Sequence, residues 1–459
     1  MALTTRHPGP AIVAHDETPK ENHTTLRHVA RRRVQAVRGA VAARIPAVPS
    51  KSATHRALVA AALARGESRI LRPLVADDTR ITAAGLRQLG VTIDDANRDV
   101  WIVRGAGPRL AGGGELSLGD SGTSLRFLLA AAALGSIPAQ LDGSARLRER
   151  PVGELARALG DLGASVRCTA GGGGLPAFAG GRFPEGGAVR IAGSPSSQFA
   201  SALLLIGAAL PRGLDLRVDP PVVSRPYVEL TVEVLAAFGP RVEQVEPNRW
   251  RVQRTEYPGV ELEIEGDASS ASYFLALPAI VGGRVRVDGL RPRSVQPDAR
   301  LGAILASLGC TVRTGEAWVE VEGRGETPGF ELEIGDAPDL VPTLAAIALF
   351  ASGPTTLRGV SHLRVKESDR LELLARNLTA LGRPARALQD RLEIGAPAGA
   401  LRGARIETRS DHRMAMAFAV AGLKLPGVEI DDADCVAKSN PDFWELLERV
   451  VAGTGDAGP

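Results

Sequence analysis

A glycine that closes a helix recurs along most of this chain at nearly constant spacing. Segments ending in Leu-x-x-Leu-Gly or Leu-x-x-Phe-Gly place this glycine at positions 90, 163, 239, 309 and 382, at intervals of 70 to 76 residues, and a looser sixth copy ends at Gly453. Glycine just past an apolar helical stripe is typical of a helix C-cap, because that position adopts a positive φ. A short strand-like run follows the glycine, as at 164–167 and 310–313. The chain is therefore predicted to contain six copies of one α/β unit.

A second kind of helix recurs with a similar period. These segments are small and apolar and end at glycine, and they cover 57–66, 127–135, 199–207, 273–282, 344–353 and 414–422. A helix that is apolar nearly all round is buried on every side. The repeat is too long for a solenoid, so we expect subdomains grouped three and three.

Length and composition agree with a multidomain soluble protein. The 459 residues are too many for one core, and 44% hydrophobic with 23% charged residues is ordinary for a globular chain. No apolar run of 18 residues is found, which predicts no membrane span. Three cysteines, Cys168, Cys310 and Cys435, lie far apart without metal-ligand spacing. This usage favours a reducing, cytoplasmic compartment and predicts no metal site.

The ends of the chain are predicted to be tails. The first 45 residues carry eight Lys and Arg against three acids, and we expect residues 1–44 to form a disordered basic tail. A polyanion-binding arm is the alternative reading, and the absence of an apolar core segment argues against a secretory signal. A short second tail is expected at 454–459. The remaining body has a net charge of about −2, so it is no general nucleic-acid surface.

Five clusters combine cations with hydroxyls, amides or carboxylates where a helix is expected to begin. They cover 49–56, 119–126, 146–151, 193–199 together with 224–227, and 364–370. Free amides and the helix dipole make such N-termini suitable for anions. Each cluster also has a plainer reading, as a helix cap, a turn, solvated arginines or a salt-bridged surface helix.

The cluster at 364–370 carries the most chemistry. A helix starting near Lys366 would place Glu367 and Arg370 on one face. Three further short motifs open or precede later helices, namely Asp339, the run Asp411-His412-Arg413, and Lys438. The histidines of the body, His55, His362 and His412, all lie in or beside these clusters.

Taken in order, these motifs resemble the 5-enolpyruvylshikimate-3-phosphate (EPSP) synthase family. The resemblance runs from about Ile45 to Val451 and includes Ser-Gly-Thr-Ser-x-Arg, Ser-Ser-Gln-Phe, Arg-Val-Lys-Glu-Ser-Asp-Arg and Asp-His-Arg-Met-Ala-Met. It implies an α/β fold with two lobes, each of three βαβαββ repeats around buried parallel helices. The N-terminal lobe would span 51–265, and the C-terminal lobe 45–50 plus 266–453, with crossovers near Ser50 and Gly266.

The resemblance also implies a reaction. The family transfers the enolpyruvyl group of phosphoenolpyruvate to the 5-hydroxyl of shikimate 3-phosphate without metal or organic cofactor. Asp339 and Glu367 would handle protons together with Lys51. Shikimate 3-phosphate would be held by Lys51, Ser52, Arg56, Ser196, Ser197, Gln198, Ser224, Tyr227, Asp339, His362 and Lys366. Phosphoenolpyruvate would be held by Lys51, Gly122, Arg146, Gln198, Arg370, Arg413 and Lys438.

Three positions depart from the family pattern. Pro49 stands where glycine is usual, and His362 replaces an asparagine found in some members. Asp120 stands where asparagine is usual, which places a carboxylate beside an anion-binding cleft. Gly122 leaves room beside the phosphoenolpyruvate site, so we expect inhibition by glyphosate.

The sequence leaves other functions open besides this one. The related transferase acting on UDP-N-acetylglucosamine carries a cysteine in the loop that corresponds to 143–150, and this loop has none. A paralogue using another phosphorylated cyclic acid is the main alternative, and a catalytically dead anion-binding scaffold is a further one. We expect a monomer that binds two small molecules and neither nucleic acid nor membrane.

Overall fold

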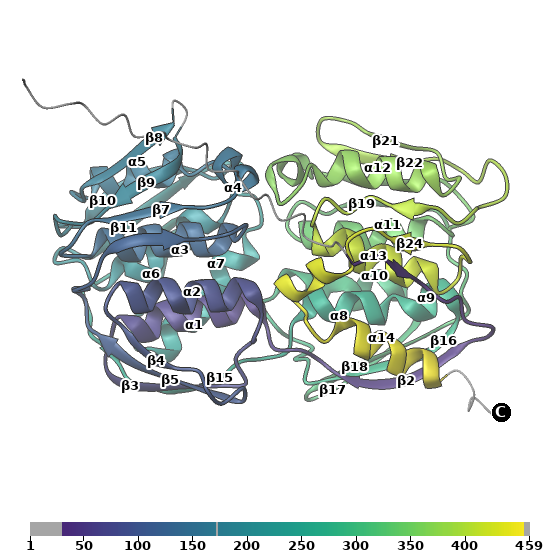
Figure 1. The fold of residues 1–459 in the computed structure, drawn as a ribbon, viewed down its shortest axis with the longest axis horizontal. Coiled ribbons are helices and arrows are strands. Elements are labelled where there is room, and N and C mark those ends of the chain that lie inside the picture. Colours follow the sequence, from purple (N-terminus) through teal and green to yellow (C-terminus); the bar gives the residue numbers. More distant parts are fainter. Residues whose placement is uncertain (1–29, 171–172, 454–459) are drawn as a thin grey trace, which may run out of the picture.

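The computed structural model describes residues 30–170 and 173–453. They form two lobes that stand side by side (Figure 1). One apolar core gathers the buried residues from Ala53 to Ile264, and a second gathers those before Pro49 and after Gly266 together with Leu74 and Ala76. Within the described residues, three small sheets surround the buried helices of each lobe.

Two sheets of the N-terminal lobe share the order strand, helix, strand, helix, strand, strand. In each, the first two strands are parallel and the last two form an antiparallel pair. One copy consists of β6 (Gly114–Ser117), α3 (Gly122–Ala133), β7 (Ala139–Asp142), the short α4 (Ala145–Glu149), α5 (Gly153–Asp161), β8 (Val166–Ala170) and β9 (Gly174–Ala179). The other consists of β10 (Gly187–Ala192), α6 (Gln198–Gly207), β11 (Leu214–Asp219), α7 (Pro226–Ala237), β12 (Val242–Glu246) and β13 (Arg249–Val252).

The third sheet of this lobe is completed by the last strands of the lobe, which follow β13 in the sequence. Its parallel edge comes from two short strands that pair with β3, namely β14 (Tyr257–Pro258) and β15 (Glu261–Glu263). The rest of the unit consists of α1 (Lys51–Ala62), β3 (Ala64–Leu71), α2 (Asp77–Gln88), β4 (Thr92–Asp94) and β5 (Val100–Ala106).

The C-terminal lobe repeats this plan. Its most regular unit comprises β19 (Glu331–Glu333), α11 (Val341–Ala348), β20 (Thr355–Arg358), α12 (Arg370–Ala380), β21 (Ala385–Ala387) and β22 (Arg391–Ile394). A second comprises α8 (Ala268–Leu275), α9 (Leu277–Val281), β16 (Gly283–Asp288), α10 (Leu301–Ser307), β17 (Thr311–Gly315) and β18 (Trp318–Gly323). The last comprises β23 (Arg405–Ile406), α13 (His412–Gly422), β24 (Glu429–Ile430) and α14 (Phe443–Ala452).

Residues 30–44, predicted to be disordered, instead belong to the C-terminal lobe. Strand β1 (Arg32–Arg33) pairs antiparallel with β24, and β2 (Val41–Pro46) pairs parallel with β16, so each completes a sheet. The physical reason is a set of apolar side chains between the arginines: Val34, Val41 and Ile45 are buried in the core. The basic composition hid this pattern. The prediction for residues 1–29 and for 454–459 lies outside the described residues.

The repeated glycines adopt the conformation that their spacing predicts. Glycines 90, 163, 239, 309 and 382 have φ between 94° and 97°. L-residues rarely adopt this region, and glycine does so without a steric cost. Gly453 differs, with a φ of −74°, which agrees with the looser match of the sixth copy. The first five copies therefore end their outer helices in the same way.

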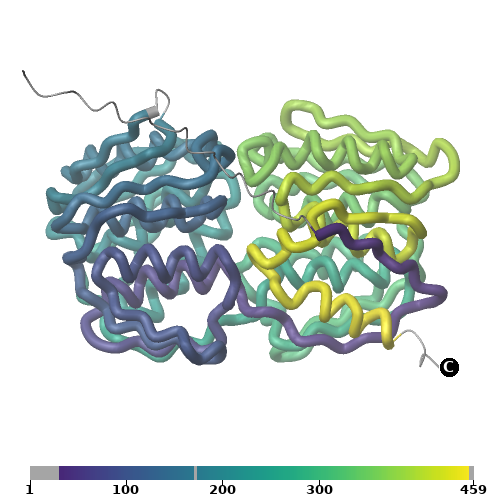
Figure 2. Tube along the Cα trace, in the orientation of Figure 1, coloured from purple at the N-terminus to yellow at the C-terminus, as the bar shows by residue number. Residues whose placement is uncertain are grey.

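The two lobes are joined by two crossing segments that lie next to each other. Figure 2 shows the first of them, in purple, running from the C-terminal lobe into the N-terminal lobe. Pro49 forms a β-bridge with Gly266, and the Ser50 amide donates to the carbonyl of Glu265 at 2.8 Å. The carboxylate of Asp267 accepts the amide of Lys51 at 2.9 Å and that of Ser270 at 2.7 Å. One carboxylate therefore ties together the first turns of α1 and α8, which lie in different lobes.

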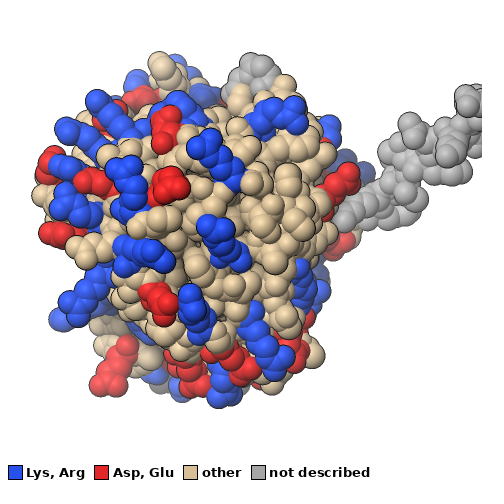
Figure 3. All heavy atoms as spheres, turned by 90° about the vertical axis from the view of Figure 1, so that its left-hand side faces the viewer, with Lys and Arg blue, Asp and Glu red and all other residues tan. Residues whose placement is uncertain are grey.

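The outer face of the N-terminal lobe carries basic and acidic side chains interspersed (Figure 3). Many of them form ion pairs along the strands, such as Arg190 with Asp219 at 2.7 Å and Arg249 with Asp215 at 2.7 Å. Among the helices of the described chain, none has the length and apolar character needed to cross a membrane.

Candidate functional site

A polar pocket lies between the lobes, where the buried helices begin. Its walls come from both lobes, and the lining residues are Lys51, Ser52, Arg56, Thr123, Arg150, Pro195, Ser196, Ser197, Gln198, Ser224, Tyr227, Asp339, Lys366, Glu367, Arg370 and Arg413. Lys51 and Gln198 are the first residues of α1 and α6, and Arg370 is the first of α12. Helix N-termini carry partial positive charge, so several helices direct a field that favours anions into one cleft.

Caps fix these helix starts. Ser50 accepts the amide of Ala53 before α1, and Asp411 accepts the amide of Arg413 before α13. Asp369 caps α12 by accepting the amide of Glu372. The helix predicted to start near Lys366 thus starts at Arg370 instead, because Asp369 provides the cap. Lys366 and Glu367 lie in the loop between α12 and the short helix η3 (Ser361–Val365).

Asp339 lines the cleft and contacts cations and a tyrosine around it. It precedes α11 in the short helix η2 (Pro338–Leu340), and its carboxylate pairs with Arg370 at 3.0 Å and Arg413 at 2.8 Å. The hydroxyl of Tyr227, from the other lobe, donates to it at 3.1 Å. Burial alone would raise the pKa of Asp339, but the cations Arg413, Lys366 and Arg370 outweigh it and hold this pKa below its usual range. Asp339 is therefore an ionised carboxylate.

Glu367 is the second acid of the cleft. It pairs with Arg370 at 2.7 Å and lies 3.7 Å from Arg150 of the N-terminal lobe. Burial opposes ionisation, yet Arg370, Arg150 and Lys438 together hold the pKa of Glu367 well below its usual range. The predicted contact between Glu367 and Arg370 is present, although a loop and not a helix brings the two together.

Lys51 and Lys366 supply ammonium groups. Lys51 Nζ is 3.0 Å from Asp78 Oδ2, a buried carboxylate on α2 that the sequence motifs did not single out. Burial lowers the pKa of Lys366 to about 8, and the neighbouring Asp339 partly offsets this effect. Both lysines lie within a cleft that presents cations from the two lobes to one small volume.

Neutral donors line the other wall. Ser196, Ser197 and Gln198 open α6, and the Gln198 side chain donates to Thr123 Oγ1 at 3.0 Å. Ser224 holds a left-handed φ of 52°, and its buried hydroxyl has no partner among the described residues. Arg56 is almost fully buried and already donates to Thr231, Ser201 and the Tyr227 carbonyl. These groups fit a phosphorylated, hydroxyl-bearing ligand.

One predicted residue lies outside the pocket lining and has other partners. Arg146, expected to bind phosphoenolpyruvate, does not line the pocket; its guanidinium donates to the carbonyls of Lys366, Glu367 and Arg364 and pairs with Glu149. Arg150, four residues later, lines the pocket in its place. The i, i+3 spacing of Arg146 and Glu149 was the available signal that Arg146 already has a local partner.

Three other predicted residues also lie outside the pocket lining. A Cβ on Gly122 would lie 2.4 Å from the guanidinium of Arg150, so this glycine leaves the space that the Arg150 side chain occupies. Lys438 donates to the carbonyl of Asp120 at 3.1 Å. His362 is buried, and neither ring nitrogen has a partner within the described chain.

Asp120 does not direct its charge into the cleft. Its carboxylate accepts the hydroxyl of Ser144, the N-cap of α4, and Asp120 does not line the pocket. Only its main-chain carbonyl meets the cleft cations, at 3.1 Å from Lys438 and 3.4 Å from Arg150. The carboxylate that departs from the family pattern is thus engaged elsewhere.

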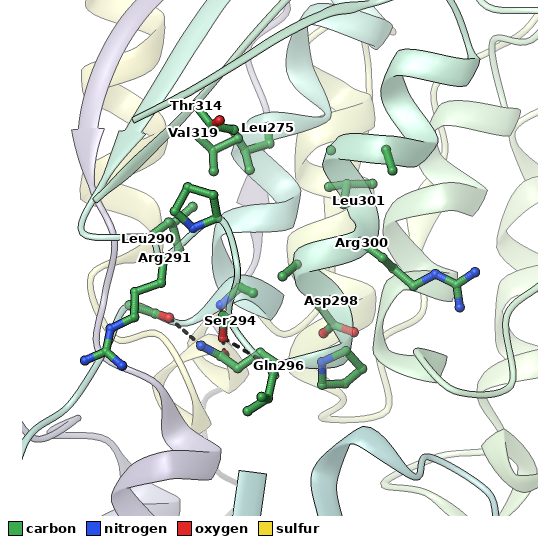
Figure 4. A pocket seen from close by; sticks show the side chains of 18 of the residues that line it. Leu275, Leu290, Arg291, Ser294, Gln296, Asp298, Arg300, Leu301, Thr314 and Val319 are labelled. Carbon is green, nitrogen blue, oxygen red and sulfur yellow. Dashed lines mark hydrogen bonds between the residues drawn. The ribbon is translucent and has the colours of Figure 1, made fainter. Parts of the chain in front are cut away.

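A roomier cavity, about 520 Å³, opens beside the lobe crossover (Figure 4). Leu275, Leu290, Leu301 and Val319 make its walls apolar. One oxygen of Asp298, a lining residue, is buried without a hydrogen-bond partner among the described residues. Arg291, Asp298 and Arg300 also line the cavity, so it holds fewer charged groups than the polar pocket. No group of three or more His, Cys, Asp or Glu in the described ranges is placed to hold a metal ion.

Comparison with known proteins gives the same assignment as the motifs. The family described as EPSP synthase (3-phosphoshikimate 1-carboxyvinyltransferase) matches residues 34–447. A 3-phosphoshikimate 1-carboxyvinyltransferase of Methanoculleus marisnigri is 44% identical over 412 residues, which cover 89% of this chain and 97% of that protein. One of Syntrophobacter fumaroxidans is 43% identical, covering 92% and 99%.

Solved structures show the same architecture. EPSP synthase from Acinetobacter baumannii superposes with a TM-score of 0.76 at 27% identity, covering 92% of this chain and 98% of that one. The enolpyruvyl transferase NikO from Streptomyces tendae shares the fold, with a TM-score of 0.69 at 20% identity, over 91% and 96% of the two chains. The fold is thus the two-lobed α/β fold of enolpyruvyl transferases. Within that class, the chain belongs to the EPSP synthase (3-phosphoshikimate 1-carboxyvinyltransferase) family.

Proposed function

We propose that this protein transfers the enolpyruvyl group of phosphoenolpyruvate to the 5-hydroxyl of shikimate 3-phosphate and releases phosphate. One observation carries the proposal: a chain of the EPSP synthase family brings cations from both lobes around two buried carboxylates in a single cleft. The two reactants bring about six negative charges, which charge-assisted hydrogen bonds to Lys and Arg would balance at roughly 1.5–3 kcal/mol each before desolvation.

Shikimate 3-phosphate would occupy the wall made by α1, α6 and α7. Ser196, Ser197 and Gln198 would receive the phosphate, supported by the α6 N-terminus. Tyr227 and Lys366 would hold the ring and its carboxylate, with Ser52, Arg56 and Ser224 completing the contacts. His362 is buried and does not line the pocket, so it would act on the substrate only through its neighbours.

Phosphoenolpyruvate would occupy the part of the cleft nearest Arg150. Arg150 replaces Arg146 in this role, and it acts with Lys51, Arg370 and Arg413. Gly122 leaves room for the Arg150 guanidinium, and Lys438 lies close enough to lower the pKa of Glu367. Inhibition by glyphosate stays a prediction of this arrangement.

The proton chemistry follows from the charges. Asp339 is ionised and accepts the proton of the 5-hydroxyl, whose oxygen attacks C2 of phosphoenolpyruvate. C3 gains a proton at the same stage, giving a tetrahedral intermediate. Phosphate then leaves from C2 while C3 loses a proton, which restores the double bond. Lys51, which forms an ion pair with Asp78, takes part in these proton transfers.

Glu367 is assigned to C3. In the ligand-free cleft its low pKa keeps Glu367 deprotonated, so it has no proton to deliver. Bound phosphate and carboxylate groups would offset the charges of Arg370, Arg150 and Lys438, so the pKa of Glu367 would rise when the reactants bind. The same residue can then deliver a proton to C3 and later remove one.

The identity of the product tests this function. Purified protein incubated with phosphoenolpyruvate and shikimate 3-phosphate should form one new species, seen by mass spectrometry as the enolpyruvyl ether of shikimate 3-phosphate. Unphosphorylated shikimate, which lacks the group that Ser196 and Ser197 would bind, should react poorly. Equal reaction of both acceptors, or none with either, would contradict the proposal.

We also propose an oligomeric state and a cellular location for the protein. A monomer suffices because both walls of the cleft come from one chain. The cytoplasmic location is supported only by the separation of the three cysteines, which form no disulfide among the described residues.

A further inference from the structure

A buried chain of hydrogen bonds links α1, α2 and α3 behind the cleft. The Nδ1 atom of His55 lies 2.7 Å from Thr82 Oγ1, which lies 2.8 Å from Ser124 Oγ. Ser124 Oγ lies 2.7 Å from Ser121 Oγ and 3.1 Å from the main-chain oxygen of Asp78. The side chains of His55, Thr82, Ser121 and Ser124 are all fully inaccessible to solvent. None of them lines the pocket, and the chemistry proposed above uses none of them.

Counting donors fixes the direction of every bond in this chain. The Asp78 carbonyl can only accept, so the single hydroxyl proton of Ser124 points to it. Ser124 Oγ must then accept from both Ser121 and Thr82, which uses its two lone pairs. Thr82 has given its proton to Ser124, so it accepts from His55.

The imidazole of His55 is consequently held in one tautomer. Nδ1 carries the proton, and Nε2 is a bare nitrogen without a partner in the described structure. Burial lowers the pKa of His55 to about 3, so the ring is neutral near pH 7. The hydrogen bonds of this network therefore have one set of directions. These directions cannot reverse while Nδ1 of His55 donates to Thr82.

The members of the chain stand directly behind groups of the cleft. His55 lies one turn after Lys51 on α1, and Asp78, whose carbonyl ends the chain, pairs with Lys51 at 3.0 Å. Ser121 caps α3 at the turn that presents Thr123 to the pocket and Gly122 to Arg150. Movement in the chain would therefore shift Lys51 and the start of α3 relative to each other.

We propose that His55 is a positioning residue for the transfer reaction, which orders the Thr82–Ser124–Ser121 hydroxyls and thereby fixes the Lys51–Asp78 pair against the start of α3. This inference rests on the proposed function, because it gives the aligned groups their task. His55 touches no reactant and acts only through Thr82 and the residues beyond it.

Side-chain geometry offers matched variants. In His55→Asn the amide nitrogen is the same number of bonds from the main chain as Nδ1, so it can donate to Thr82. In His55→Gln the amide lies one bond further, near the position of Nε2, and His55→Phe keeps the ring size without a donor. Thr82→Val removes the next hydroxyl. Thr355→Val serves as a control, because Thr355 is a buried threonine in β20 of the other lobe and outside the cleft.

The experiment measures kcat, KM for each substrate and the thermal midpoint for each folded variant, with wild-type turnover in the same assay testing the proposed function separately. His55→Phe, His55→Gln and Thr82→Val should lower kcat/KM about tenfold, the scale expected when a buried acceptor loses its donor. His55→Asn should stay close to wild type, and Thr355→Val should change only the thermal midpoint. The double variant His55→Phe/Thr82→Val should have a kcat/KM no lower than that of the less active single variant, because both substitutions interrupt the same series of hydrogen bonds.

Three results would overturn the proposal. The first is full turnover of folded His55→Phe and Thr82→Val with only the thermal midpoint lowered, which is the behaviour of a purely structural contact. The second is an equal loss in His55→Asn and His55→Gln. The third is multiplication of the two single losses in the double variant. Absence of turnover in the wild type would count against the proposed function itself.

Discussion

Arg150 and Arg146 show how much a single position matters within one short motif. Both belong to the run 146–151, yet only Arg150 reaches the pocket, while Arg146 joins the lobes by donating to carbonyls of the 364–367 loop. We expect Arg150→Gln to lower kcat/KM for phosphoenolpyruvate by about 10- to 100-fold, the loss of one charge-assisted contact. Arg146→Gln should cost less and affect both substrates alike. Steady-state kinetics of the two variants shows which arginine binds phosphoenolpyruvate. A larger loss of kcat/KM in Arg146→Gln than in Arg150→Gln would assign this role to Arg146.

Gly122 offers a steric test of the same arginine. A Cβ at this position would lie 2.4 Å from the Arg150 guanidinium, which then has to move. Gly122→Ala should therefore raise KM for phosphoenolpyruvate several-fold while KM for shikimate 3-phosphate changes little. Gly160, on the outer helix α5 with open space around its Cβ position, provides the matched alanine control. An unchanged KM for phosphoenolpyruvate in Gly122→Ala would show that Arg150 does not bind it.

Lys366 gives a pH dependence with a definite sign. Burial lowers its pKa to about 8, so the ammonium form is present below that pH and is lost as the pH rises through it. Because kcat/KM reports the free enzyme, kcat/KM for shikimate 3-phosphate should decline above about pH 8. Lys366→Arg, which stays protonated, should move the decline to higher pH. A decline that does not move in this variant would assign it to another group.

At the scale of elements, Asp267 joins α1 to α8 across the lobe boundary. Its two oxygens accept the amides of Lys51 and Ser270, and nearby Gln296 accepts the amide of Ala268 and donates to the Gly266 carbonyl. Asp267→Ala should lower the free energy of unfolding by about 1–2 kcal/mol, as for other lost N-caps. It should also reduce kcat, because the Lys51 end of α1 loses its anchor.

Asp267→Asn is the matched comparison, since it keeps one accepting oxygen. Its thermal midpoint should fall between those of wild type and Asp267→Ala, as scanning calorimetry can measure. A variant pair with unchanged midpoints and unchanged kcat would mean that the crossover does not depend on this carboxylate.

The elements were predictable where one local rule decides them. A glycine with a φ near 95° ends each of five outer helices, and that rule is local, so the repeat could be read from the sequence. The start of α12 was predicted too early because the cap is Asp369, three residues after Lys366. Strands β1 and β2 were missed because their pairing with β24 and β16 joins residues hundreds of positions apart.

The site residues likewise fall into two groups, those that a local sequence pattern identifies and those whose role depends on packing. Residues at helix starts, such as Lys51, Gln198 and Arg413, were identified because a start has a recognisable pattern. Asp78 was not, since its role depends on packing of α2 against α1 and not on a motif. His362 was assigned to the site by resemblance; the structure buries it in η3, outside the pocket lining, and its contact with the substrate stays a prediction.

At the scale of the whole molecule, the two lobes meet through the groups that would handle the reactants. Tyr227 reaches Asp339, Arg150 approaches Glu367, and Lys438 donates to Asp120. Each of these three contacts crosses the cleft. The helix N-termini of both lobes point to the same place, so neither lobe alone presents the full set of charges.

Phosphate release by the full chain tests most directly whether both lobes act on one pair of reactants. With phosphoenolpyruvate and shikimate 3-phosphate together, in the presence of EDTA, the protein should release phosphate over many turnovers. With either compound alone it should release none. Release from phosphoenolpyruvate alone at the same rate, or no release with both present, would contradict the account.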